Sequence, residues 1–253
     1  MEGEGKHVWV CVGTYNERDN LGRLLEELRE HVPEGHAVVV DDNSPDGTGE
    51  ILDGISERDA RVHPIHREGK LGYASAHRTA IAYALKHGAE TVVTMDADFS
   101  HDPAHIPALL AGIETGADVA IGSRYVAGGR TENWPWYRVA LSSTANALAR
   151  AGLGLSVSDC TSGFRAYRGS LLTRLRLDQL RSEGYSFLEE ILVACQLANA
   201  RMMEVPIVFV ERRAGRSKLS RRVILEAAWM LAKLTWRRTF ARRAMTRALV
   251  IQE

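Results

Sequence analysis

The sequence predicts an α/β fold, in which helices flank a mostly parallel sheet on both sides. Over the first 125 residues, short runs rich in valine and isoleucine alternate with segments of helical spacing. These runs are apolar on both faces, as is typical of strands in a covered parallel sheet. The sequence lacks the G-x-G-x-x-G fingerprint and the P-loop motif, which disfavours a dinucleotide-binding dehydrogenase and a P-loop ATPase.

The elements of the first half follow in order. We expect strands at residues 7–13, 36–42, 61–67, 91–98 and 117–125. We expect helices at residues 20–32, 48–60, 74–88 and 103–115. Pro64 places the third strand at a sheet edge, because proline cannot donate a ladder hydrogen bond. Gly88 closes the third helix, and Asp102 followed by Pro103 is a typical helix start.

The second half is less regular. Residues 126–138 resemble a loop, 138–153 a helix, 159–168 a loop with a short strand, 187–200 a helix and 201–213 a strand. Basic helices are expected from Leu219 onward. We therefore predict one catalytic-type α/β domain over residues 1–218 and a basic helical extension over residues 219–253.

The charge is unevenly distributed although the net charge is zero. Of the 32 basic and 32 acidic residues, twelve basic and one acidic lie between Arg212 and Arg247. A basic tail favours contact with an anionic surface or substrate. Nucleic acid is a weak candidate, because no known basic motif interleaved with aromatic residues is present.

Cysteine usage and hydropathy indicate the cellular compartment. Cys11, Cys160 and Cys195 are too few and too scattered for a disulfide framework or a zinc site. The polar start of the chain does not resemble a signal peptide, and no run of about 18 apolar residues predicts a membrane span. We expect a cytoplasmic protein.

The stretch "TVVTMDADFSHDP" (91–103) drives an apolar strand into Asp96 and Asp98. A lone D-x-D is more often a pair of turn residues. Two carboxylates this close repel each other unless a cation lies between them, and oxygen ligands suit Mg²⁺ or Mn²⁺. The strand ends "GTYNE" and "DDNSPDGT" would meet the same sheet edge, where open α/β sheets bind ligands. This convergence favours the metal site.

Seven motifs occur in series along residues 7–220. They are "GTYNERDNL", "VVVDDNSPDGT", "MDADFSHDP", "GSRYVAGG", "NWPWYR", "TSGFRAYR" and "VPIVFVERRAGRSKL". Together they resemble glycosyltransferase family 2 with the GT-A fold. Within that family the chain is most similar to the polyprenol (dolichol) monophosphate mannose synthases. The resemblance implies GDP-mannose as sugar donor, a polyprenyl phosphate as acceptor, and a divalent cation, Mg²⁺ or Mn²⁺.

The resemblance also implies roles for particular residues. Asp96 and Asp98 would hold the metal. The implied sugar-donor contacts are Thr14, Tyr15, Glu17, Val40, Asp42, Asp96, Ala97, Asp98, Arg212 and Lys218. The implied acceptor-phosphate contacts are Arg124, Arg138 and Ser142, and the implied catalytic residues are Asp98, Arg124 and Arg138. Two positions depart from the family pattern: Gly13 stands where proline is usual, and Ser100 where glutamine is frequent.

The chemistry agrees with this resemblance. A phosphate monoester has a second pKa of about 6, so it is largely dianionic at neutral pH and needs no general base. The sequence offers no obvious Ser-His-Asp or Cys-His arrangement, and direct attack would invert the sugar centre. Alternatives are a family 2 enzyme that uses UDP-glucose or another nucleotide sugar on the same lipid phosphate, or a noncatalytic nucleotide-sugar-binding subunit.

For three features the sequence leaves two interpretations open. His101 lies beside the D-x-D turn and is expected to support the site rather than to bind metal. Trp134 and Trp136 are either core anchors or lipid contacts at an interface. The tail around residues 221–238 is either a helix docked on the domain or an interfacial helix on anionic lipid. We favour a peripheral protein on the cytoplasmic membrane face, with a membrane-protein partner as a further option.

Overall fold

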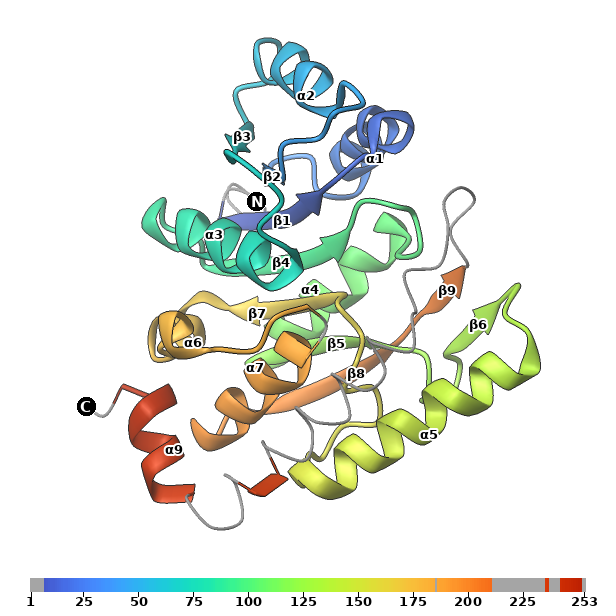
Figure 1. Ribbon diagram of the computed structural model, residues 1–253, viewed down its shortest axis with the longest axis vertical. Helices are drawn as coiled ribbons and strands as arrows, with labels where there is room; N and C mark the ends of the chain where they lie inside the picture. The colour runs from blue at the N-terminus through green and yellow to red at the C-terminus, as the bar shows by residue number, and fades with distance from the viewer. Residues whose placement is uncertain (1–6, 185, 211–234, 237–241, 252–253) are drawn as a thin grey trace.

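The computed structural model describes residues 7–184, 186–210, 235–236 and 242–251 of the chain. A seven-stranded sheet crosses the molecule, and helices cover both of its faces (Figure 1). The predicted α/β class with a mostly parallel sheet is confirmed. The basic segment 211–234, including Arg212 and Lys218, lies outside the described residues.

The strands and helices follow the predicted order, with shifted ends. The strands are β1 (Val8–Thr14), β2 (His36–Asp41), β3 (Val62–His66), β4 (Thr91–Asp96), β5 (Val119–Ser123), β6 (Arg130–Glu132), β7 (Arg165–Arg168), β8 (Met202–Pro206) and β9 (Val208–Val210). The helices are α1 (Arg18–His31), α2 (Thr48–Ser56), α3 (Tyr73–Lys86), η1 (Pro103–His105), α4 (Ile106–Glu114), α5 (Trp136–Leu153), α6 (Gly169–Thr173), η2 (Leu177–Gln179), α7 (Ser186–Leu197) and α9 (Arg242–Leu249).

The large sheet has the strand order β3-β2-β1-β4-β7-β5-β8. All neighbours are parallel except β7, which runs antiparallel to β4 and β5. Gly13 of β1 is paired with Val40 on one side and Asp96 on the other. The carboxyl ends of β1, β2 and β4 therefore lie in one row, as the sequence predicts.

Both faces of the sheet are buried, which explains the continuous apolar runs. Trp9 and Cys11 of β1 point into the core beneath α3 and α7, whereas Val10 and Val12 point into the core beneath α1 and α4. Leu21, Leu24, Leu25 and Leu28 give α1 its buried stripe. Helical spacing of leucines thus predicts which helix face is buried.

The predicted helix start at Asp102 is confirmed. The Asp102 carboxylate accepts a hydrogen bond from the backbone N–H of Ala104 at 2.9 Å, and Pro103 follows it. The first turn is a 3₁₀ turn that leads into α4. Pro64 lies in β3, which is the edge strand, because proline has no N–H for a central ladder.

Two predictions for the second half are wrong in detail. The single strand expected at 201–213 is divided at Ile207, so that β8 belongs to the large sheet and β9 pairs with β6 in a separate ribbon. The predicted loop at 126–138 contains β6. Ile207 is 1% exposed; its backbone N–H donates to the Ser123 carbonyl of β5 at 3.0 Å and its carbonyl accepts from the backbone N–H of Arg130 in β6 at 3.0 Å, so the chain passes from one sheet to the other at this residue. Among the described residues, no helix has the length and apolar character needed to cross a bilayer.

Candidate active site

The ends of β1, β2 and β4 form a cleft at the carboxyl edge of the sheet. Its lining residues are Gly13, Thr14, Tyr15, Glu17, Asp42, Lys70, Gly72, Tyr73, Ala76, Asp96, Ala97 and Asp98. All of the described residues expected to contact a sugar donor come together here, with one exception. Val40 departs from the expectation: its side chain is fully buried in the core and does not line the cleft.

The turn after β4 holds Asp98 in one position. Oδ1 of Asp98 accepts hydrogen bonds from the backbone N–H of Ser100 at 3.1 Å and from its hydroxyl at 2.6 Å. Phe99 adopts the left-handed φ of 58°, a conformation that costs free energy and that functional turns often keep. Ser100, which replaces the usual glutamine, therefore orients Asp98.

His101 stabilises the same turn from the core side. It is buried, its ring stacks on Phe164, and its Nδ1 accepts a hydrogen bond from the backbone N–H of Asp96 at 3.3 Å. Burial lowers the pKa of His101 to about 4, against the opposing charge of Asp98. The imidazole is therefore neutral at pH 7, and its 3.8 Å approach to the Asp96 carboxylate is not an ion pair at that pH.

The β2 end of the cleft is rigid because its carboxylate is already paired. Asp42 is buried, forms an ion pair with Arg67 and accepts a hydrogen bond from the backbone N–H of Gly72 at 2.9 Å. Asn16 and Asn43 turn the chain with φ values of 60° and 57°, which asparagine tolerates better than most residues. These contacts fix the shape of the cleft before any ligand enters.

A lysine that the sequence reasoning missed lies in this cleft. Nζ of Lys70 lies 3.6 Å from the centroid of the Tyr15 ring. The ammonium group adds a positive charge to a cleft that otherwise presents Glu17, Asp42, Asp96 and Asp98. The available signal was its place after the third strand, directly before Leu71 and Gly72.

Arg124 is buried and bound to a second carboxylate that sequence reasoning missed. Its Nε and Nη2 donate hydrogen bonds to Asp159 at 2.7 and 2.6 Å, and Nη2 also donates to Thr161. Burial would lower the pKa of Arg124, but the charge of Asp159 outweighs burial and raises it. Burial would likewise raise the pKa of Asp159, and Arg124 lowers it instead. Both groups stay charged.

Of the three residues expected to bind an acceptor phosphate, Arg124 and Arg138 lie beside Trp134. The guanidinium carbon atoms of Arg124 and Arg138 lie 5.8 and 4.3 Å from its ring centroid. Ser142, one turn along α5 from Arg138, accepts a hydrogen bond from the Tyr125 hydroxyl at 2.8 Å. Nη1 of Arg124 makes no hydrogen bond to a residue within the described part of the chain, so it keeps two N–H groups for an anion.

The arginine group and the carboxylate turn are neighbours. Phe209 of β9 contacts both, since its ring meets His101 edge to face at 5.4 Å and lies under Arg124 at 5.2 Å. Asp96 also contributes to the raised pKa of Arg124. The two-stranded ribbon thus joins the acidic turn to the basic cluster.

The carboxylates fit a divalent cation with an incomplete protein shell. Among the described residues, no three His, Cys, Asp or Glu side chains are grouped to hold a metal ion. Asp96 and Asp98 offer hard oxygen atoms at the mouth of a cleft, and Mg²⁺ is often held by one or two carboxylates plus phosphate oxygens and water. The donor set therefore fits Mg²⁺ or Mn²⁺ in company with a diphosphate.

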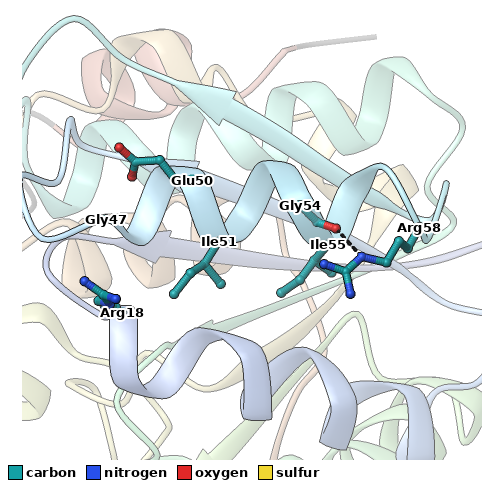
Figure 2. A pocket seen from close by; sticks show the side chains of 7 residues that line it. All are labelled: Arg18, Gly47, Glu50, Ile51, Gly54, Ile55 and Arg58. Carbon is teal, nitrogen blue, oxygen red and sulfur yellow. Dashed lines mark hydrogen bonds between the residues drawn. The ribbon is translucent and has the colours of Figure 1, made fainter.

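A larger hollow of about 570 Å³ lies elsewhere, between α1 and α2 (Figure 2). Ile51 and Ile55 of α2 point toward α1, and Arg18 and Arg58 mark its ends. Arg58 is tied to the Gly54 carbonyl, and only Glu50 contributes a carboxylate. The hollow lacks paired carboxylates and strand ends, so the smaller cleft is the candidate active site.

An acidic cleft at the carboxyl edge of a mostly parallel sheet, next to an arginine cluster, defines an enzyme that handles anionic substrates. Residues 9–176 match the family model "Glycosyl transferase family 2". The chain belongs to glycosyltransferase family 2 and is a glycosyltransferase, which confirms the resemblance.

Its relatives include proteins of one activity class. The chain is 42% identical over 225 residues to the polyprenol monophosphomannose synthase of Mycolicibacterium smegmatis, covering 88% of this chain and 85% of that protein. It is 42% identical over 220 residues to the undecaprenyl-phosphate mannosyltransferase of Micrococcus luteus, covering 87% and 90%.

Solved structures share the fold. Glucosyl-3-phosphoglycerate synthase of Mycobacterium tuberculosis, in complex with Mn²⁺, UDP and phosphoglyceric acid, has a TM-score of 0.64 at 20% identity and covers 92% of this chain and 78% of its own. A mannosyltransferase of Pyrobaculum calidifontis, in complex with GDP-Man and Mn²⁺, has a TM-score of 0.57 at 20% identity, covering 90% and 62%. The GT-A fold is thereby confirmed.

Proposed function

We propose that this enzyme transfers mannose from GDP-mannose to a polyprenyl phosphate and inverts the sugar centre. The observation that carries the proposal is the pairing of the Asp96–Asp98 turn with the arginines around Trp134 on one sheet edge. The two relatives described above support it, because both of their names describe mannosyl transfer to a polyprenyl-type lipid.

The chemistry needs positioning more than acid–base catalysis. An oxygen of the acceptor phosphate attacks the anomeric carbon of mannose, the bond from that carbon to the diphosphate oxygen breaks, and GDP leaves with the bonding electrons. The phosphate dianion is already a nucleophile at neutral pH. Arg124 and Arg138 bind it, because a guanidinium fork matches phosphate oxygens.

The sugar donor occupies the acidic cleft in this proposal. Tyr15, Glu17 and Asp42 lie at the nucleoside end, and Asp96 and Asp98 hold Mg²⁺ or Mn²⁺ at the diphosphate end. The cation, when bound, neutralises the charge that develops on the departing diphosphate. Arg212 and Lys218, which lie outside the described residues, are proposed to reach the same diphosphate.

We also propose that the enzyme works at a membrane surface. A polyprenyl chain stays in the bilayer, so the enzyme must come to its acceptor. Residues 1–218 form the catalytic domain in this proposal, and the basic extension 219–253 adds affinity for anionic lipid. This places the protein peripherally on the cytoplasmic membrane face.

One transfer assay tests the proposal. Purified enzyme is given radiolabelled GDP-mannose or UDP-glucose, polyprenyl phosphate, and Mg²⁺ or Mn²⁺, with a chelator as control. We expect labelled lipid from GDP-mannose only, and none with the chelator. Transfer from UDP-glucose but not from GDP-mannose would show that the sugar donor is the alternative nucleotide sugar. Nucleotide binding without transfer would instead support a noncatalytic subunit.

A further inference from the structure

Trp134 carries a buried hydrogen-bond donor that the proposed function does not use. Its indole Nε1 is shielded from solvent and has no hydrogen-bond partner within the described part of the chain. This N–H is the single polar group of the indole, so the hydrogen-bonding capacity of the side chain is unsatisfied. Buried polar groups are nearly always paired in folded proteins, because an unpaired donor has lost its water without a replacement. The N–H is therefore available for an acceptor that the described residues do not supply.

The backbone on both sides of Trp134 sets the direction in which its side chain leaves the chain. Asn133 has a left-handed φ of 63°, and Pro135, directly before α5, has a φ of −67° and a ψ of 146°. A residue that precedes proline is restricted to extended backbone conformations. Trp134 thus stands between a left-handed residue and a rigid one, an arrangement that functional turns often keep.

Three side chains pack around the indole, and none of the three has a lone pair for its N–H. The guanidinium carbon atoms of Arg138 and Arg124 lie 4.3 and 5.8 Å from the ring centroid, and the Phe209 ring meets it nearly edge to face at 5.3 Å. Arginine has donors only. A ligand with a negative charge and several lone pairs would accept from the N–H and face both guanidinium groups at once.

We infer that the indole N–H of Trp134 donates a hydrogen bond to the acceptor phosphate. The inference rests on the proposed function, which assigns that phosphate to Arg124 and Arg138, the two arginines beside the ring. The diphosphate of the sugar donor fits less well, because Trp134 is not among the residues that line the acidic cleft. A neutral donor orients a phosphate oxygen without adding a further positive charge, which would make that oxygen a weaker nucleophile.

Nuclear magnetic resonance of the indole groups in the full chain tests the contact directly. The five tryptophans give one Nε1–H signal each in ¹⁵N-labelled protein, and the signal that Trp134→Phe removes belongs to position 134. Geranyl phosphate, a short isoprenyl phosphate, is added in the presence of Mg²⁺ and GDP. Geraniol is the matched ligand without a phosphate. We expect geranyl phosphate to move the Trp134 indole proton downfield and geraniol to leave it in place.

The other outcomes of this titration contradict defined claims. A shift produced by Mg²⁺ and GDP that geranyl phosphate does not extend would overturn the inference, because the N–H would then serve the sugar donor. An equal shift with geraniol would also overturn it, and so would binding of geranyl phosphate, measured by calorimetry, without any shift. Failure of the proposed function looks different: the wild-type enzyme would then bind no geranyl phosphate at all.

Two changes at position 134 measure the strength of the hydrogen bond. Trp134→Phe removes the N–H and part of the ring, whereas benzothienylalanine at this position keeps both rings and replaces only the N–H by sulfur. Both changes should raise KM for geranyl phosphate at least about tenfold, as expected for a hydrogen bond to a charged group. KM for GDP-mannose should stay within about twofold of wild type. The benzothienyl protein should unfold at the same urea concentration as wild type, because the N–H is unpaired in the free enzyme.

Trp9→Phe is the control for the loss of a buried indole far from the site. Trp9 is 4% exposed and stacks on His36 near the amino ends of β1 and β2. This variant should lower the urea midpoint and keep KM for geranyl phosphate within about twofold of wild type. A benzothienyl protein with the wild-type KM would overturn the inference whatever Trp134→Phe does, because only the ring at position 134 would then matter.

Discussion

The two sides of the candidate active site would each bind a phosphate group, but they carry opposite charges. The β1–β2–β4 side presents carboxylates on tight turns, and Lys70 is the positive side chain among its described lining residues. The α5 side presents guanidinium groups among aromatic rings, with Asp159 as a buried counter-charge. Each side should therefore bind phosphate by a different route.

This difference predicts where the enzyme depends on metal. An acidic cleft repels a diphosphate until a cation enters, whereas the arginine side binds a phosphate without one. Metal removal should thus abolish binding of the sugar donor and spare binding of the acceptor phosphate. The predictions below test the two sides separately, from the largest expected effect to the smallest.

The largest effect, a loss of free energy of unfolding, should come from the Arg124→Met variant. This change leaves the carboxylate of Asp159 buried and unpaired, which should lower the free energy of unfolding by about 3–5 kcal/mol. Arg138→Met, whose guanidinium lies over Trp134, should cost about 1 kcal/mol. Urea denaturation of both variants measures the difference, and equal losses would contradict it.

The double variant Arg124→Met/Asp159→Leu is the matched control for that effect. Removing both charges should restore most of the stability, because no unpaired carboxylate remains. Transfer activity should stay lost if Arg124 binds the acceptor phosphate. A double variant that is stable and fully active would restrict Arg124 to a structural role.

The next effect should come from Asp98→Asn. The amide keeps the size of the side chain and an acceptor for Ser100 but removes the charge that holds a cation. We expect kcat/KM to fall at least about 100-fold, as for the loss of one strong transition-state contact. Asp178→Asn, on an exposed side chain far along the chain, should change kcat/KM less than about twofold. Full activity of the Asp98→Asn variant would remove this residue from the metal site.

His77 of α3, beneath the acidic cleft, should make stability depend on pH. It is buried, neither ring nitrogen bonds to a residue in the described ranges, and burial lowers its pKa to about 3. The unfolded chain binds a proton near pH 6.5, so the stability from the neutral ring is present above that pH and is lost as pH falls. His77→Leu should reduce the loss between pH 7 and pH 5 by about 2 kcal/mol, measured by urea denaturation at both pH values. Parallel losses in both proteins would contradict this.

The smallest effect should come from Lys70→Met. Loss of the ammonium group over Tyr15 should raise KM for the sugar donor about tenfold, since hydrogen bonds to charged groups contribute about 1.5–3 kcal/mol. Binding of the free nucleotide diphosphate, measured by calorimetry, should weaken in parallel. Lys86→Met, on an exposed lysine at the end of α3, is the control. An unchanged KM would place Lys70 outside the binding path.

The sequence predicts the acidic side well because its signals are local. Strand ends at Thr14, Asp41 and Asp96 follow continuous apolar runs, and parallel pairing must bring such ends together. Val40 is the exception: its side chain is buried in the core. Period-2 alternation does not predict this, because Val39 on the opposite face of the sheet is equally buried.

The basic side could be predicted only in part, because its contacts join distant residues. Nothing near Arg124 in the sequence indicates that Asp159 neutralises it, and nothing near Asp96 indicates the antiparallel strand β7 beside it. Trp134 lies against two arginines and Trp136 is exposed, so the interpretation as a core anchor is wrong for Trp136. Such pairings depend on tertiary packing rather than on local pattern.

Helix α5 has a consequence for the range of acceptors. It carries the proposed phosphate-binding arginine Arg138 at the edge of the exposed apolar residues Leu141 and Leu148. At about 100° per residue Arg138 lies only about 60° around the helix from Leu141, so the phosphate would be bound beside this apolar face. Isoprene units beyond the first few would then stay in the bilayer, away from the cleft. Polyprenyl phosphates of different chain length should therefore be used at similar rates.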